Sequence, residues 1–215
     1  MEKGTAICHG NLWDGSDLGK NLGEIIKNLL GKAVPDLYPK LEMGARPIDK
    51  GHPELLLKTV DLKALPDVFY ASDKGLGLVV KEGSKCVPNP NAEICKEVYD
   101  YLVSEQEYGN KDTRTGKALE RRFGGTPYGW ELDMLRLIMA TLFRAGSIEA
   151  THQGSRYHNY QDPLCRKVFT NTPAFRGSLF SPRQTFGLKA LTQAVQQLEV
   201  LTGEEVDVEE GAIAT

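Results

Sequence analysis

The sequence predicts a mostly helical α+β fold, and three observations in one stretch support this prediction. From Glu131 to Ala145, apolar residues recur every three or four positions, which is the period of an amphipathic helix. Gly146 follows, and glycine suits the left-handed backbone position that ends many helices. From Ile148 the period changes to two, and Gln153-Gly154-Ser155 reads as a turn before a returning strand at Arg156–Tyr160. A helix, a glycine and a β-hairpin in this order form the second half of a winged helix.

The predicted helix at residues 131–145 has an apolar side and a polar side. The apolar side carries Leu132, Leu135, Ile138, Met139, Leu142 and Phe143. The opposite side carries Asp133, Arg136, Ala140 and Arg144, and we expect it to be exposed.

Two helices are predicted upstream of this stretch. A longer one runs from Pro90 to Gln106, with Asn89-Pro90 as its N-terminal cap, and a short one runs from Thr115 to Phe123 and ends at Gly124-Gly125. Residues 108–114 form a polar connection between them. The order helix, short helix, helix, hairpin completes a winged-helix domain, which we place at residues 89–162.

The N-terminal segment, residues 1–88, is predicted to hold two helices and a small β-hairpin. After a linker at residues 1–16, a helix runs from Leu18 to Leu30 with Ser16 or Asp17 as N-cap; Gly31 follows its end, and Pro35 and Pro39 prevent its continuation. Pro53 opens a second helix at residues 55–65, which Pro66 ends. The hairpin pairs residues 68–70 with residues 76–81, and residues 86–91 form a loop.

The C-terminal segment, residues 163–215, begins where Asp162-Pro163 breaks the strand. Residues 168–180 are predicted to be extended and packed over the core, because Phe169, Phe175 and Phe180 stand among turn-forming residues. Ser181-Pro182 opens a last helix to Leu201, which Thr202-Gly203 ends. The acidic ending reads like the first turn of another helix, so we expect the chain to be a fragment of a longer protein.

Composition sets limits on the class of protein. Hydrophobic residues make up 40% and charged residues 26% of the chain, as in ordinary globular domains. No apolar run is long enough to span a membrane, and no basic segment followed by an apolar one marks a secretion signal at the N-terminus. The four cysteines do not suggest a disulfide framework. We therefore expect a cytoplasmic protein with reduced thiols and no membrane partner.

Charge is distributed unevenly along the chain. Residues 111–189 carry 13 Lys/Arg and 6 Asp/Glu, whereas residues 190–215 carry no Lys/Arg and 6 Asp/Glu. A basic patch on a winged helix favours a polyanion as partner. Alternatively, the acidic tail neutralises the basic stretch within the fold or within a larger parent chain.

Patterns for catalysis or cofactor binding are weak. Gly15–Asn21 resembles a phosphate-binding loop, but it is one residue too short and ends in Asn where Ser or Thr would bind magnesium. His152, His158 and Cys165 have spacings that match no zinc pattern. Cys8-His9 lies in a flexible start, and the chain has no Gly-x-Ser-x-Gly elbow. We predict no catalytic, metal or cofactor residues, and no cofactor.

The nucleic-acid hypothesis rests on basic side chains of the winged domain. A winged helix typically inserts its third helix into the major groove and lays its wing on the backbone. The candidate contacts to DNA or to a protein partner are Lys117, Arg121, Arg122, Arg136, Arg144, Arg156 and His158. Glu131 and Asp133 lie at the N-terminal end of the third helix, where they would repel phosphates. Docking to protein and non-specific contact to double-stranded DNA therefore both stay open.

The run Pro127–Ala150 resembles a known family. The segments Pro127-Tyr128-Gly129-Trp130 and Leu142-Phe143-Arg144-Ala145-Gly146 are its most distinctive parts, with Thr115-Gly116 before them and Phe175-Arg176 after them. They resemble the region downstream of the ATPase core in the large P-loop ATPases of bacterial BREX phage-defence systems, the BrxC/PglY family. The resemblance extends over nearly the whole chain, from Tyr38-Pro39-Lys40 to the acidic ending.

The resemblance implies a non-catalytic, cytoplasmic part of a much longer ATPase. No position of this chain matches the nucleotide-binding lysine of that family. The implied partners are the remainder of the parent ATPase, other defence-system proteins and, through the wing, DNA. The alternative is a free-standing winged-helix transcription regulator, for which the last helix would serve in dimerisation.

Overall fold

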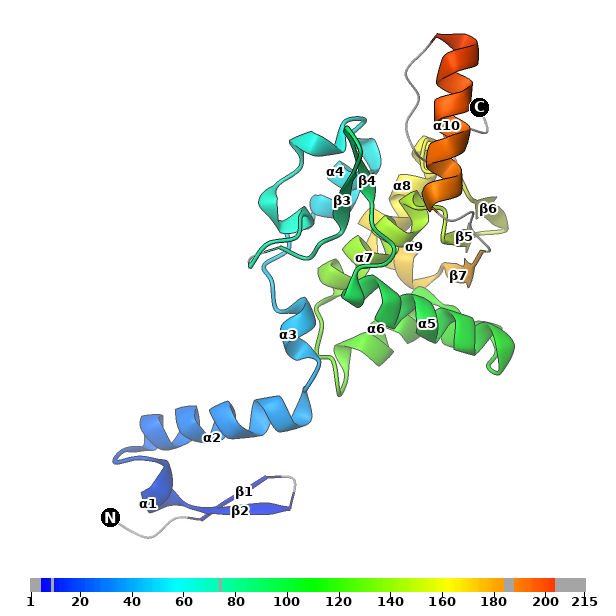
Figure 1. The fold of residues 1–215 in the computed structure, drawn as a ribbon. Helices are drawn as coiled ribbons and strands as arrows, with labels where there is room; N and C mark the ends of the chain where they lie inside the picture. Colours follow the sequence, from blue (N-terminus) through cyan, green and yellow to red (C-terminus); the bar gives the residue numbers. More distant parts are fainter. Residues whose placement is uncertain (1–4, 9, 74, 184–187, 204–215) are drawn as a thin grey trace.

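The computed structural model describes residues 5–8, 10–73, 75–183 and 188–203. A main body holds most of the chain, and an N-terminal arm, which ends with the helix at residues 22–37, stands off from one end of it (Figure 1). The last helix rises from the body on the side away from the arm (Figure 1). The predicted class, α+β and mostly helical, is confirmed.

The winged-helix order predicted from the sequence is present in the body. The helices are α5 (Glu93–Glu107), η3 (Lys111–Arg114), α6 (Gly116–Gly124) and α7 (Leu132–Arg144), and the hairpin strands are β5 (Ile148–His152) and β6 (Ser155–Tyr157). The Thr115 hydroxyl accepts a hydrogen bond from the Ala118 amide at 3.3 Å and caps α6. The predicted cap of α5 is wrong, because the N-cap is Ala92, which has no side-chain hydrogen bond to the helix.

Gly146 ends α7 as predicted. Its φ is +73°, and the amides of Gly146 and Ser147 donate to the carbonyls of Phe143 and Leu142 at 3.0 and 2.9 Å. This Schellman arrangement satisfies carbonyls that the helix end would otherwise leave free. The hairpin then turns through Gln153 and Gly154, both with positive φ, so that His152 pairs with Ser155.

The segment after the hairpin differs from the prediction. Residues 168–180 are not extended: α8 (Pro163–Thr170) and α9 (Thr172–Arg176) precede strand β7 (Leu179–Pro182), which pairs with β5 to give the order β6-β5-β7. Asp162 and Asn171 cap the two helices through their side chains, and proline occupies the first turn of each. The predicted packing over the core is confirmed, since Phe169, Phe175 and Phe180 are fully buried.

The N-terminal arm also differs from the prediction. The expected linker contains a hairpin, β1 (Thr5–Cys8) with β2 (Asn11–Asp14), followed by α1 (Gly15–Leu18). The next helix, α2 (Leu22–Leu37), starts and ends later than predicted: its N-cap is Asn21, and it continues through Gly31 and Pro35. Proline at position 35 removes one intrahelical hydrogen bond, but the helix continues past it, and the Tyr38 amide donates to the Val34 carbonyl at 2.8 Å.

Between the arm and α5, the chain forms short elements. They are α3 (Leu41–Gly44), α4 (His52–Lys58), η1 (Leu62–Ala64), η2 (Asp67–Phe69), β3 (Val79–Glu82) and β4 (Lys85–Pro88). The predicted helix at 55–65 is therefore wrong in extent, because α4 ends at Lys58. The predicted hairpin is wrong in its choice of strands: residues 67–69 form a 3₁₀ turn, and the strands that pair are β3 and β4, most of the latter being in the predicted loop.

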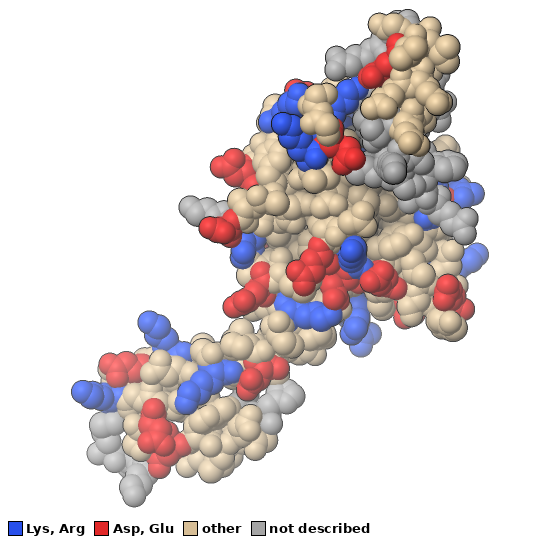
Figure 2. All heavy atoms as spheres, in the orientation of Figure 1, with Lys and Arg blue, Asp and Glu red and all other residues tan. Residues whose placement is uncertain are grey.

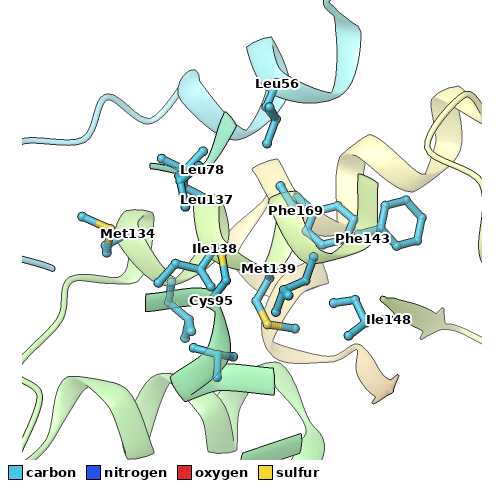
Figure 3. Close-up of a cluster of buried hydrophobic side chains, with 14 of the residues drawn as sticks. Leu56, Leu78, Cys95, Met134, Leu137, Ile138, Met139, Phe143, Ile148 and Phe169 are labelled. Carbon is cyan, nitrogen blue, oxygen red and sulfur yellow. The ribbon is translucent and has the colours of Figure 1, made fainter. Parts of the chain in front are cut away.

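The core joins parts from all three predicted segments. Leu56 of α4, Cys95 of α5 and Phe169 of α8 belong to one buried cluster around α7 (Figure 3). The domain division at residues 88 and 162 stays a prediction. The last helix, α10 (Leu188–Thr202), ends at Gly203 with φ +72°, as predicted. Its predicted start at Ser181-Pro182 is wrong, because these two residues belong to strand β7 and pair with β5. The acidic residues 204–215 lie outside the described part. Among the described residues, no helix is long and apolar enough to cross a membrane.

Candidate interaction surfaces

Helix α7, the third helix of the winged unit, is enclosed by the body. Every side chain from Met134 to Arg144 is buried, including those of the side that was predicted to be exposed. Figure 3 shows Leu137, Ile138 and Met139 of α7 surrounded by side chains from α4, α5, α8 and β5. The prediction of an exposed polar face is wrong, because α4 and α8 pack against α7 on sides that the sequence pattern assigned to solvent.

Arg144 holds α4 against α7. Arg144 is 2% exposed, and its guanidinium donates to the carbonyls of Leu56 and Thr59 and lies 4.6 Å from the centre of the Tyr160 ring. Leu56 and Thr59 are at the C-terminal end of α4, where carbonyls lack helical partners and a positive charge is favourable. Arg144 therefore has a structural function, and its side chain does not reach the surface.

Arg136 has the same kind of structural function, and it holds α9 against α7. Its side chain is 5% exposed, donates to Asp133 at 2.9 Å and to the Thr172 hydroxyl, and lies 5.8 Å from the centre of the Phe175 ring. Thr172 is the first residue of α9, so this contact fixes the start of that helix. Two of the seven candidate contact residues, Arg136 and Arg144, are therefore buried in the body.

The exposed candidates on α6 are Lys117, Arg121 and Arg122. The helix turns them outward because Gly116, Leu119 and Phe123 face the core. Gly116 allows α6 to approach α9 closely, since a Cβ at this position would lie 1.9 Å from the Phe175 carbonyl oxygen. Lys117 and Arg121 are four residues apart, so they share one side of the helix.

Arg122 borders a polar and aromatic cluster on the surface of the body. Its guanidinium lies 5.7 Å from the centre of the Tyr101 ring and 5.5 Å from that of Tyr128. The Tyr128 hydroxyl donates to Glu97 at 2.8 Å, and the Lys40 ammonium donates to the same carboxylate at 2.6 Å. Burial alone would raise the pKa of Glu97, but the hydrogen bonds from Lys40 and Tyr128 and the charge of Arg122 together lower it.

This cluster joins the arm to the body. The Lys40 amide donates to the Pro127 carbonyl at 3.0 Å, and the Trp130 indole N–H donates to the Lys40 carbonyl at 3.0 Å. A Cβ on Gly44 would lie 2.6 Å from the Trp130 ring, so the chain after Lys40 also packs closely on that indole. This junction was not predicted from the sequence, although the motif Pro127-Tyr128-Gly129-Trp130 could have indicated it.

The remaining candidates, Arg156 and His158, lie at the hairpin and are exposed. The Arg156 Nε donates to Glu149 Oε2 at 2.8 Å, and Nη2 contacts the same oxygen, so a buried carboxylate already neutralises this arginine. Together with Glu149 and with Arg183, which is not among the predicted contacts, Arg156 and His158 line a hollow of about 320 Å³.

The exposed basic side chains do not gather on one element. Helix α6 packs against α7, α9 and η3, whereas the hairpin packs against α7, α8 and β7. On the face drawn in Figure 2, acidic atoms gather over α5, with basic atoms beside them. Residues 91–110, which include α5, contain five Asp/Glu and one Lys.

The histidine and cysteine side chains form separate structural contacts. The His152 Nδ1 lies 3.1 Å from the Ser178 hydroxyl, and the buried Cys165 thiol donates to the Tyr160 carbonyl at 3.6 Å. Burial raises the pKa of Cys165 to about 12, so its thiolate is scarce at neutral pH. Among the described residues, no three His, Cys, Asp or Glu side chains come together as a metal site.

Comparison with known proteins identifies a family for the body. Residues 60–174 match the family model described as the winged helix-turn-helix domain of the BREX ATP-binding protein BrxC. No curated protein and no solved structure matches the chain. The match begins before η1 and ends within α9, so the arm and α10 lie outside it. It covers more than half of the chain and confirms the resemblance seen in the sequence, so the chain belongs to the BREX BrxC winged helix-turn-helix family.

Proposed function

We propose that the chain is a non-catalytic docking module of a BREX phage-defence ATPase, and that it binds the ATP-binding remainder of that enzyme in the cytoplasm. The observation that carries this proposal is the enclosure of α7. A winged helix that reads DNA in the usual way needs its third helix free to enter the major groove. Here α4 and α8 cover that helix, and its two arginines hold neighbouring helices in place.

The same observation weighs against a free-standing transcription regulator. Sequence readout requires side chains that reach base edges, and Arg136 and Arg144 would have to leave buried hydrogen bonds to do so. Nucleotide binding is also not expected of this chain. The Gly15–Asn21 segment, which resembled a phosphate-binding loop, contains helix α1 and the N-cap of α2 instead of an open loop.

The exposed side of α6 is the docking surface that we propose. Lys117 and Arg121 project from a helix whose inner side is fixed by Leu119 and Phe123. Because these two cations are exposed and belong to a rigid element, an acidic surface could bind them without rearrangement of the body. Arg122 contributes less, since it already lies over two aromatic rings.

Non-specific contact to DNA is the second candidate function. Lys117, Arg121, Arg156 and His158 stay exposed, and phosphate contacts need only accessible positive charge. Such binding would be independent of base sequence and strongly weakened by salt. It would use the surface of α6 and the hairpin while α7 remains buried.

Binding of the purified ATP-binding remainder, measured by calorimetry, tests the docking proposal. We expect saturable binding that the double substitution Lys117→Glu with Arg121→Glu weakens roughly tenfold or more. The matched control is Lys63→Glu with Lys81→Glu, which makes the same charge change at two exposed sites outside α6. Absence of binding by the unmodified chain would contradict docking, and equal loss in both double variants would contradict the choice of surface.

Fluorescence anisotropy with a labelled random duplex tests the second candidate. The chain is titrated at low and at physiological salt, together with the same two double variants. Salt-sensitive binding that only the α6 variant loses would support phosphate contact. No binding at low salt would exclude DNA contact and leave docking.

A further inference from the structure

Arg114 of η3 is buried where three elements of the body meet. Only 8% of this residue is exposed. Its guanidinium Nη1 donates to Gln106 Oε1 of α5 at 3.1 Å and to Ser181 Oγ of β7 at 2.9 Å. Helix α5, η3 and β7 each pack against the other two, and β7 lies close to α5 in Figure 1. One side chain from each of the three elements therefore converges on a buried positive charge.

The charge of Arg114 has no carboxylate beside it. The other two buried arginines of the described chain are placed differently: Arg136 pairs with Asp133 at 2.9 Å, and Arg144 bonds to carbonyls at the C-terminal end of α4. Arg114 bonds to two neutral acceptors, and it forms no ion pair with the residues that the structure describes. A buried cation without a counterion is unfavourable for folding, so the packing of the body alone does not explain this arginine.

The groups around Arg114 can donate further hydrogen bonds. Its Nε atom is buried and has no hydrogen-bond partner in the described part of the chain, and Nη2 has none there either but is not fully buried. Ser181 Oγ accepts from Arg114, so its own proton remains to be donated, and the amide nitrogen of Gln106 carries two more N–H groups. Several donors and one positive charge in one place are the chemistry of an oxyanion site.

These donors suit a single carboxylate better than a row of phosphates. The N–H of Nε and one N–H of Nη2 lie on the same edge of the planar guanidinium, which matches the two oxygens of a carboxylate. Helix α5, whose last turn carries Gln106, belongs to an acidic stretch, since residues 91–110 contain five Asp/Glu and one Lys. This stretch repels a duplex, which brings many negative charges together, more strongly than one carboxylate that enters below the surface.

The oxyanion site borders the surface proposed for docking. Thr115, the residue after Arg114, caps α6, and Lys117 is exposed in the first turn of that helix. We infer that Arg114, Ser181 and Gln106 bind an oxyanion, and that an Asp or Glu side chain of the docked ATP-binding remainder supplies it. The identity of the partner rests on the proposed docking function, whereas the oxyanion site is a property of this chain alone.

The variant Arg114→Met tests the role of the site in docking. Methionine keeps an unbranched apolar side chain and removes the charge. In calorimetry with the purified ATP-binding remainder, we expect affinity to fall roughly tenfold or more, because the carboxylate of the partner is then buried without its cation. The melting temperature of the free chain should stay the same or rise, because an unpaired buried charge is removed. A lower melting temperature with unchanged affinity would mean that Arg114 is only structural and would overturn the inference.

The matched control is Arg166→Met, at a half-buried arginine of α8. This variant makes the same chemical change outside the site and should leave the affinity unchanged. An equal loss of affinity in the two variants would overturn the assignment to Arg114.

Sodium acetate tests the oxyanion site without the partner. In ¹H–¹⁵N NMR spectra, the Nε–H signal of Arg114 is identified by its loss in Arg114→Met. We expect acetate to shift this signal saturably, and sodium chloride at the same ionic strength to leave it in place. No shift with acetate, or an equal shift with chloride, would overturn the site even if the remainder binds. Sodium phosphate is the third probe, and saturation by phosphate at lower concentrations than by acetate would overturn the choice of a carboxylate.

The two measurements separate this inference from the docking proposal. A saturable shift with acetate, together with no binding of the ATP-binding remainder by the unmodified chain, would overturn docking and the assigned partner but would support the oxyanion site. Binding of the remainder that Arg114→Met leaves unchanged would support docking and overturn the inference.

Discussion

Helices α2 and α7 look alike in sequence and differ in their surroundings. Both have apolar residues at intervals of three and four, and both have polar residues on the other side. In α7, all residues from Met134 to Arg144 are buried. In α2, whose sixteen residues all lie in the described part of the chain, Ala33 is the single buried residue.

An apolar period therefore predicts a helix but not which elements cover it. Helix α7 is covered on several sides because α4, α5, α8 and β5 all pack against it. Helix α2 packs mainly against the four-residue α1. In a buried helix, polar side chains such as those of Arg136 and Arg144 make hydrogen bonds within the body. In an exposed helix, the apolar side chains stay accessible to a partner.

The largest expected effect comes from the indole that joins the arm to the core of the body. Trp130→Ala should lower the free energy of unfolding by about 3–5 kcal/mol, because it removes a buried ring stacked on Phe123. Urea unfolding followed by circular dichroism measures this. Trp13→Ala, at the half-buried tryptophan of the arm, is the control and should cost far less. A loss below about 1 kcal/mol for Trp130→Ala would mean that the ring is a surface contact.

The same substitution in both helices compares them directly. Ile138→Ala should cost about 2–5 kcal/mol, since Ile138 is fully buried. Ile26→Ala should cost under about 1 kcal/mol, since its side chain is already half exposed in the arm. Urea unfolding of the two variants at low protein concentration gives both values. Equal costs would show that α2 is as well packed as α7 and would remove the contrast.

Arg144→Leu tests whether the buried arginine is structural. The substitution leaves the Leu56 and Thr59 carbonyls without their donor, and we expect a loss of about 2–3 kcal/mol in the free energy of unfolding. Arg121→Leu, at an exposed arginine of α6, should change this free energy by less than about 0.5 kcal/mol. Thermal unfolding of both variants measures the difference. If Arg144→Leu left the free energy of unfolding unchanged, the side chain would have no structural function and would again be a candidate surface contact.

The smallest effect concerns pH and the junction between arm and body. The pKa of Glu97 is lowered in the folded chain, so its contribution to stability is complete above the ordinary value of 4.5 and is lost as the pH falls below it. Glu97→Gln should remove part of that loss. Unfolding free energies measured from pH 7 down to pH 3 should therefore fall less steeply for Glu97→Gln than for the unmodified chain. Parallel curves would show that the Lys40–Glu97 pair is not coupled to stability.

Much of the winged unit could be predicted from its sequence because its signals are local. The period of α7, the positive φ of Gly146 and the tight turn at Gln153-Gly154 each depend on a few neighbouring residues. The Thr115 cap and the end of α6 at Gly124 are of the same kind. Local signals of this type determine one element at a time, and they predicted these elements within a few residues.

The rest depends on contacts between distant residues. Nothing near Arg144 in the sequence shows that Leu56 and Thr59 supply carbonyls to it, so its burial could not be foreseen. Aromatic residues hid the helical signals of α8 and α9, although Asp162-Pro163 and Asn171 with Pro173 were visible caps. The predicted end of α2 is too early because Pro35 was expected to stop the helix, whereas a single proline can be accommodated near a helix end.

Hydrogen exchange followed by mass spectrometry compares the exposure of α2 and α7 in one experiment. We predict that amides of α7 exchange only through global unfolding, at the same slow rate with and without duplex DNA, while amides of α2 exchange much faster. Exchange of α7 as fast as that of α2 would contradict the enclosure of α7. Protection of α7 that increases on addition of DNA would also contradict it, because the helix would then be open in the free chain and covered by the nucleic acid.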